Sequence, residues 1–221
     1  MKRAQLAPGV SIRRSLGEAN ADQLAAVKEV IGRVRAEGDE ALLHYTQKWD
    51  GVELDGLRVS PEEMAEAVGR FDAQLLEDLA EAAGNIRSYH QLQELQGFRQ
   101  NDPNGSYMGQ RVTPIRSAGL YVPGGTAAYP SSVLMNVIPA QVAGVKRIVL
   151  VSPPGKDGKL SDGVLAAAHI LGIDEIYKVG GAQAVAALAY GTETIAPVDK
   201  ITGPGNVFVA LAKREVFGDV A

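Results

Sequence analysis

The sequence predicts an α/β fold in which a helical N-terminal region precedes a Rossmann-like parallel sheet. In the second half of the chain, short β-branched runs alternate with helical patterns of roughly ten residues, as in βαβ units. In the first half, apolar residues recur at helical spacing and strand-like runs are scarce. We therefore divide the chain into an N-terminal arm (1–20), a mainly helical region (21–106) and a Rossmann-like domain (107–221).

The composition restricts the partners and the compartment. The 221 residues carry a formal net charge of −4, so the chain lacks the basic surface that nucleic-acid binders need. No apolar run approaches the roughly 18 residues of a membrane helix, and the N-terminus lacks a secretory pattern. The absence of cysteine excludes disulfides and thiolate metal sites. We expect a soluble, cytoplasmic protein with no nucleic-acid and no membrane partner.

The helical region begins after the arm of residues 1–20. From Asp22, apolar residues fall on one helical face until Gly38 ends the pattern. A second short helix carries residues 41–45 and ends at the turn Trp49-Asp50-Gly51. This order predicts two consecutive helices at the start of the region.

Two further helices have clear start signals. Ser60-Pro61-Glu62-Glu63 is a capping box, in which the Ser60 hydroxyl accepts from the Glu63 amide and the Glu63 side chain reaches back. Asp72 caps a longer helix. The buried side of that helix is predicted to consist of Leu75, Leu76, Leu79, Ala82, Ala83, Ile86 and Tyr89. Residues 57–59 are predicted to be a short strand, and 97–106 an exposed connection with a turn at 101–105.

The Rossmann-like domain is predicted to alternate between strands and helices. Met108 to Ile115 has strand character, and the four strands that follow are predicted at 119–122, 147–151, 175–179 and 199–202. The helices between and after them are predicted at 132–143, 162–171, 182–190 and 206–217. Such alternation indicates parallel strands joined by right-handed crossovers.

Glycine-rich turns follow three of these strands. They are Gly-Leu-Tyr-Val-Pro-Gly-Gly (119–125), Val-Gly-Gly-Ala-Gln (179–183) and Ile-Thr-Gly-Pro-Gly-Asn (201–206). Glycine allows a ligand to approach the backbone closely, and a helix that starts after such a turn favours an anion. Because ligands bind at the carboxyl ends of parallel strands, the three turns predict the rim of one pocket. The alternative is that they are only tight connections.

Polar residues in these turns add a second signal. Tyr121 offers a ring face and a hydroxyl, and the amides of Gln183 and Asn206 can donate and accept without charge. Each residue also has a purely structural interpretation. Tyr121 would lie in the core, Gln183 would be exposed on its helix, and Asn206 would be an N-cap. Both interpretations stay open for each residue.

Other common signatures are missing from the sequence. There is no Gly-x-Ser-x-Gly elbow and no Walker-type Gly-Lys-Ser/Thr, and the turn at 203–208 lacks the third glycine of the dinucleotide fingerprint. His44, His90 and His169 lie far apart in the sequence and fall on three different predicted helices. We interpret them as packing or surface residues, so the sequence predicts no metal site of its own.

The turn sequences closely resemble the histidinol dehydrogenase family. The resemblance also includes Ser-Ser-Val-Leu-Met (131–135), the segment 179–193, Asp-Lys-Ile-Thr-Gly-Pro-Gly-Asn (199–206) and the upstream Gly-Asp-Glu-Ala-Leu (38–42). It covers essentially the whole chain. The family oxidises L-histidinol to L-histidine through the aldehyde, in two NAD-dependent steps at a zinc-containing site.

The resemblance implies an NAD-contacting surface in residues 107–221. The matched positions are Tyr121, Gln183 and Asn206 for NAD contacts, and Pro123, Gly124, Gly203 and Gly205 for the surrounding surface. Ser131 is a weaker candidate for the adjoining substrate cleft. The family also implies a small-molecule substrate and a homodimer.

In the family, the zinc ligands and a Glu-His acid/base pair lie beyond the position matched by Ala221. No catalytic or metal-binding residue is therefore assigned in this chain. We expect an N-terminal portion of a histidinol dehydrogenase, inactive by itself. Two alternatives stay open: a related enzyme that oxidises another small polar alcohol, such as a sulfonated diol, and a non-catalytic fragment that folds or self-associates.

Overall fold

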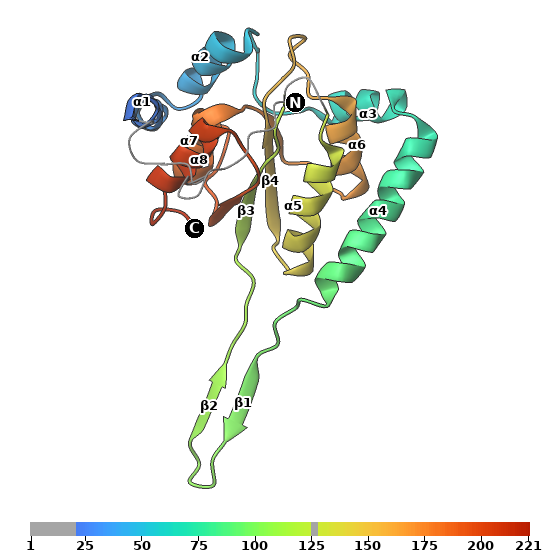
Figure 1. Cartoon of the computed structure of the whole chain (residues 1–221), viewed down its shortest axis with the longest axis vertical. Coiled ribbons are helices and arrows are strands. Elements are labelled where there is room, and N and C mark those ends of the chain that lie inside the picture. The colour runs from blue at the N-terminus through green and yellow to red at the C-terminus, as the bar shows by residue number, and fades with distance from the viewer. Residues whose placement is uncertain (1–20, 125–127) are drawn as a thin grey trace, which may run out of the picture.

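A computed structural model describes residues 21–124 and 128–221 (Figure 1). The helices are α1 (Ala21–Glu37), α2 (Asp39–Asp50), α3 (Pro61–Arg70), α4 (Ala73–Gln91), α5 (Pro130–Val142), α6 (Asp162–Ile170), α7 (Gly181–Tyr190) and α8 (Val207–Glu215). The strands are β1 (Phe98–Asn101), β2 (Tyr107–Gln110), β3 (Ser117–Tyr121), β4 (Arg147–Ser152), β5 (Ile176–Lys178) and β6 (Lys200–Thr202). The predicted arm, 1–20, lies outside the described residues, as does Gly125 of the first turn.

The main sheet has the strand order β5-β4-β3-β6 with every pair parallel. The chain moves outward from β3 to β4 and β5, then returns through α7 to place β6 on the other side of β3. This is the order of the first four strands of a Rossmann fold, 3-2-1-4. The predicted α/β class with a parallel sheet is confirmed. None of the helices in the described ranges is long and apolar enough to cross a membrane.

Helices cover both faces of the sheet. The first core lies between the sheet and helices α1, α2, α7 and α8, and it contains Tyr121 and Val149. The second core lies on the opposite face of the sheet and contains Leu120 and Leu150. Successive strand residues therefore point to opposite faces, as expected of strands buried on both sides. Figure 1 shows α5 and α6 on one side of the sheet and α7 and α8 on the other.

The N-terminal helices contribute to both cores. Val27 of α1 and Leu42 of α2 pack in the first core, whereas Ala67 of α3 and Ala83 of α4 pack in the second. The helices of residues 21–91 are therefore divided between the two faces of the sheet. The boundary at 106/107 stays a prediction.

Short segments pair with both outer strands of the main sheet. The Val59 amide donates to the Ile176 carbonyl at 2.9 Å, and the Lys178 amide donates to the Leu57 carbonyl at 2.7 Å. The strand predicted at 57–59 is therefore a single antiparallel bridge alongside β5. On β6, the Ile201 amide donates to the Ala221 carbonyl at 2.8 Å.

The predicted buried side of α4 is wrong at its two ends. Leu75 is 50% exposed and Tyr89 is 61% exposed, because α4 packs on α5 and α6 through its middle. Ala83 is buried there, and Leu79, Ala82 and Ile86 pack against the second core. Helical periodicity identified a face of α4 but did not indicate how much of that face is covered.

The predicted connection at 97–106 contains half of a projecting hairpin. β1 and β2 pair antiparallel, with Phe98 opposite Gln110, and all residues of both strands are exposed. Strand character was predicted from Met108 to Ile115, but β2 ends at Gln110. The turn is confirmed, since the Gly105 amide donates to the Asp102 carbonyl at 3.0 Å. Figure 1 shows the hairpin extending away from the helices and the main sheet.

Candidate functional site

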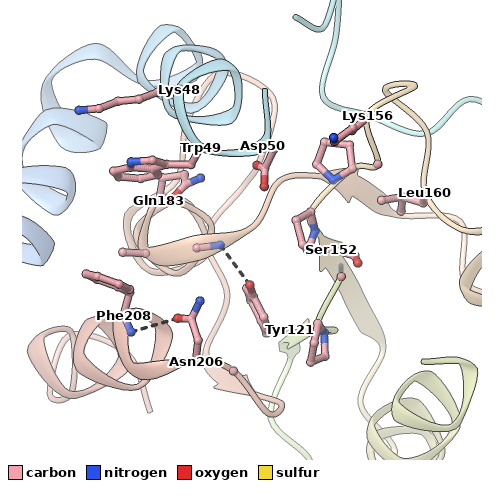
Figure 2. Close-up of a pocket in the computed structure, with 18 of the residues that line it drawn as sticks. Lys48, Trp49, Asp50, Tyr121, Ser152, Lys156, Leu160, Gln183, Asn206 and Phe208 are labelled. Atoms are coloured by element: carbon pink, nitrogen blue, oxygen red, sulfur yellow. Dashed lines mark hydrogen bonds between the residues drawn. The ribbon is translucent and has the colours of Figure 1, made fainter. Parts of the chain in front are cut away.

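A cavity of about 1100 Å³ lies at the carboxyl ends of the four parallel strands. Its lining comes from the segments that follow β3, β4, β5 and β6, with residues of α1 and α2 closing one side. The sheet order places the topological switch point between β3 and β6, where open α/β sheets bind ligands. The cavity therefore lies where the predicted pocket rim was expected (Figure 2).

Most of the predicted site residues line this cavity. The lining includes Tyr121, Pro123, Gly124, Gln183, Gly205 and Asn206. Gly203 and Ser131 are not among the lining residues, and Ser131 is exposed in the first turn of α5. The parallel sheet brings together positions as distant in sequence as Tyr121 and Asn206.

The Tyr121 hydroxyl connects the end of β3 to the start of α7. The Gly181 amide donates to this hydroxyl oxygen at 3.1 Å, which leaves the hydroxyl proton available to a ligand. Tyr121 is 4% exposed and belongs to the first core, so it is a core residue that also lines the cavity. Burial raises the pKa of its hydroxyl, and the Asp50 carboxylate raises that pKa further. The hydroxyl therefore stays protonated at neutral pH.

Gln183 is buried, contrary to the structural interpretation that placed it exposed on its helix. Only 1% of the residue is exposed, yet its Oε1 has no hydrogen-bond partner in the described part of the chain. An unpaired buried carbonyl oxygen costs free energy that a ligand donor would recover. Gln183 lies in the first turn of α7 and lines the cavity (Figure 2).

Asn206 is the N-cap of α8, as its structural interpretation predicted. Its Oδ1 accepts from the Phe208 amide at 3.0 Å and from the Val209 amide at 3.1 Å. Only the side-chain oxygen of Asn206 takes part in the cap, so the NH₂ group of its side chain has no part in it. Asn206 can therefore cap its helix and donate to a ligand at the same time.

The glycines of the turns are required by close packing. A Cβ on Gly203, where φ is +113°, would lie 2.1 Å from the Tyr121 carbonyl oxygen. A Cβ on Gly124 would lie 2.5 Å from Cγ of Pro153, and one on Gly205 would lie 2.4 Å from Cγ1 of Val209. Lys213 Nζ also donates to the Gly203 carbonyl at 2.7 Å. These glycines shape the cavity by allowing strand ends and helix starts to approach each other.

The last turn of α2 forms a wall of the cavity that sequence reasoning missed. Trp49 and Asp50, interpreted only as a turn, both line the cavity, and Trp49 remains 50% exposed. The Trp49 ring stacks on Tyr45 with centroids 4.6 Å apart, which fixes its orientation. Phe208, 39% exposed, lines the cavity from α8. No local pattern in the sequence indicates that the end of α2 reaches this cavity.

Asp50 is the cavity residue whose acidity is most strongly altered. Burial raises the pKa of its carboxyl from 3.8 to about 6. Figure 2 shows the carboxylate directed from α2 into the cavity, on the side facing Tyr121. Lys48 and Lys156 also line the cavity, so both signs of charge are represented around it.

Metal ligands do not gather in the described part of the chain. No group of three or more His, Cys, Asp or Glu side chains there is arranged to hold a metal ion. His44, His90 and His169 lie on α2, α4 and α6, as the sequence predicted. The described residues therefore do not fit a zinc site.

The sequence matches one family along nearly its whole length. The family model for histidinol dehydrogenase matches residues 13–221. The histidinol dehydrogenase of Geobacillus kaustophilus is 61% identical over 221 residues, which are 100% of this chain and 52% of that protein. That of Bacillus subtilis is 59% identical over 211 residues, which are 96% of this chain and 49% of that protein.

A solved structure has the same fold. The crystal structure of histidinol dehydrogenase from Elizabethkingia anophelis matches with a TM-score of 0.89 at 38% sequence identity. The match covers 95% of this chain and 48% of that one. The chain spans about half the length of the curated relatives it matches. With the family model covering residues 13–221, the chain belongs to the histidinol dehydrogenase family.

Proposed function

We propose that this chain supplies the NAD-binding part of an enzyme that oxidises L-histidinol to L-histidine in two steps. The observation that carries the proposal is the set of unused polar groups in the cavity. These groups are the Tyr121 hydroxyl proton, the Gln183 Oε1 and the Asn206 amide. Two donors and one acceptor on the rim of a Rossmann-like cavity suit the hydroxyls, phosphates and carboxamide of a dinucleotide.

The residues of this chain would bind and orient the cofactor. Tyr121 and Asn206 donate to acceptor atoms of the ligand, and the buried Gln183 oxygen accepts from a ligand N–H or O–H. The exposed faces of Trp49 and Phe208 cover the flat rings of the bound cofactor and exclude water from them. NAD, when bound, accepts a hydride from the alcohol carbon of the substrate.

The remaining chemistry lies outside the described residues. Since these residues do not fit a zinc site, no zinc ligand, acid or base is assigned here. In the proposed whole enzyme, those groups would come from the part of the relatives that this chain does not match. We therefore propose that the 221-residue chain binds NAD but does not oxidise histidinol alone.

NAD titration by isothermal calorimetry tests this function directly. We expect binding by the wild-type chain and a loss of about tenfold in affinity for Gln183→Ala and for Asn206→Asp. Asn206→Asp retains an oxygen that can cap α8 while removing the amide donor, so a folding defect is avoided. Binding curves that coincide for wild type and both variants would refute the assignment, and zinc-dependent histidinol oxidation by this chain alone would refute its expected inactivity.

Substrate identity and assembly are separate parts of the proposal. A related enzyme acting on another small polar alcohol would share this NAD site, and a substrate panel on the longer relatives distinguishes the two. We also propose a cytoplasmic homo-oligomer. Its self-association is supported by exposed apolar side chains at the end of α4, in the segment that follows α4 and on the hairpin. They are Tyr89, Leu92, Leu95, Phe98, Tyr107 and Met108. Analytical ultracentrifugation that finds only monomer at high concentration would contradict self-association.

A further inference from the structure

Asp50 occupies a position that is electrostatically unfavourable for a carboxylate. It is the last residue of α2, and Gly51 follows with φ at +73° and its amide donating to the Gln47 carbonyl. The C-terminal end of a helix carries partial negative charge, so an acidic side chain there is repelled. In the described part of the chain no donor or cation stabilises the carboxylate, and burial alone perturbs it. Nothing in α2 itself therefore explains why an aspartate occupies this position.

A ligand in the cavity would provide that explanation, because the Asp50 carboxylate faces the cavity without a hydrogen-bond or ion-pair partner among the described residues. Asp50 lines the cavity, and its charge acts on the Tyr121 hydroxyl across from it. Gln183 Oε1 is a second unpaired acceptor in the same cavity. A carboxylate and an amide oxygen without partners fit a ligand group that carries hydroxyl donors, and the carboxylate repels a phosphate.

The usual acidic position of a Rossmann fold, directly after the second strand, holds no carboxylate in this chain. In such folds a carboxylate after the second strand binds the ribose hydroxyls of NAD. Here the second strand is β4, which ends at Ser152 and is followed by Pro153 and Pro154. Asp157, further along, also lines the cavity, but there its Oδ1 accepts from the Lys159 amide at 3.2 Å within a turn. The carboxylate that faces the cavity without a partner comes from α2 instead.

We propose that Asp50 accepts hydrogen bonds from the adenosine ribose of the bound dinucleotide and rejects a 2′-phosphate. Asp50 would thus set a preference for NAD over NADP from a helix outside the Rossmann-like sheet. This inference rests on the proposed NAD site and adds coenzyme selection to it. The ligand hydroxyls supply the partners that the carboxylate lacks in the protein.

Calorimetric titration of NAD and NADP into wild type, Asp50→Asn and Asp55→Asn tests the inference. Asp55 is exposed and lies outside the cavity lining, and Asp55→Asn removes the same charge, so it is a matched control. We expect wild type to bind NAD at least about tenfold more tightly than NADP. Asp50→Asn should reduce that ratio by about tenfold, whereas Asp55→Asn should leave it unchanged.

Adenosine half-ligands locate the effect. Wild type should bind 5′-AMP more tightly than 2′,5′-ADP, and Asp50→Asn should bind the two with similar affinity. If wild type binds NAD but Asp50→Asn keeps the full preference, the role of Asp50 is refuted and the NAD site stands. If wild type binds neither NAD nor NADP, the proposed function is refuted together with this inference.

Discussion

The carboxylate of Glu63 lies 3.2 Å from Nζ of Lys178, and both side chains are only 14% exposed. Glu63 was predicted to reach back and complete the capping box of α3. Ser60 does accept from the Glu63 amide at 3.1 Å, but the Glu63 side chain turns to β5. The ion pair therefore connects α3 to the outer strand of the main sheet.

Removing Lys178 should be costly because it leaves a largely buried carboxylate without its cation. We expect Lys178→Met to lower the free energy of unfolding by about 2–3 kcal/mol in urea denaturation. The double variant Lys178→Met, Glu63→Leu should regain much of that loss, since no buried charge remains. A loss below about 0.5 kcal/mol for the single variant would mean that water already solvates Glu63.

Asn206 should have separable roles in stability and in binding. Asn206→Ala removes the side-chain acceptor of the Phe208 and Val209 amides and should cost about 1 kcal/mol of unfolding free energy. Asn206→Asp keeps an acceptor at the helix N-terminus and should unfold within about 0.5 kcal/mol of wild type. Thermal or urea denaturation without ligand measures both. Equal destabilisation by the two variants would contradict the capping role.

Asp50 should destabilise the fold at neutral pH, because burial raises its pKa from 3.8 to about 6. The folded state then binds its proton more tightly than the unfolded state does. The penalty is absent below pH 3.8, grows as the pH rises to about 6 and is complete above that. Since solvent screens this half-exposed group, Asp50→Asn should stabilise the chain by no more than about 1 kcal/mol at neutral pH.

Denaturation of wild type and Asp50→Asn across this pH range measures the difference. We expect the gain at neutral pH to vanish as the pH falls to 3.8. A gain that is independent of pH would instead show that the asparagine side chain fits the end of α2 better for reasons other than charge. Asp55→Asn again controls for the change in net charge.

Gly203 should tolerate no side chain. At φ of +113°, a Cβ would meet the Tyr121 carbonyl oxygen at 2.1 Å, so Gly203→Ala should cost about 2 kcal/mol or more. Gly172 has φ of +67°, and a Cβ there would meet nothing within 4 Å, so Gly172→Ala should cost only about 1 kcal/mol. Gly172→Ala adds backbone strain alone, whereas Gly203→Ala adds both strain and crowding. The difference between their unfolding free energies in urea therefore measures the crowding. Similar losses would show that β3 and the turn after β6 can move apart.

Local sequence patterns predicted the elements that local forces decide. The β-branched runs became strands, Ser60 and Asp72 became N-caps, and the glycine turns met at one edge of the sheet. These features depend on neighbours within a few residues or on the general geometry of parallel sheets. Most of the residues indicated by the resemblance line the cavity for a related reason, because the matched turns are brought together by the sheet.

The missed features depend on how distant segments dock. Trp49 and Asp50 reach the cavity because α2 packs against α7, and nothing in their local sequence specifies that contact. Leu75 and Tyr89 lie on the apolar face of α4, but only tertiary packing decides where coverage ends. Ser131 follows the first glycine turn closely, yet the start of α5 leaves it exposed and outside the lining.

The segments that pair with β5 and β6 restrict how two copies of the fold could associate. An outer strand with unpaired backbone groups invites strand addition and aggregation. Residues 57–59 pair with the outer side of β5, and Ala221 pairs with Ile201 of β6. Continuation of the main sheet into another molecule would require displacing one of these segments. The hairpin strands β1 and β2 each pair on one side only, so strand addition there requires no such displacement.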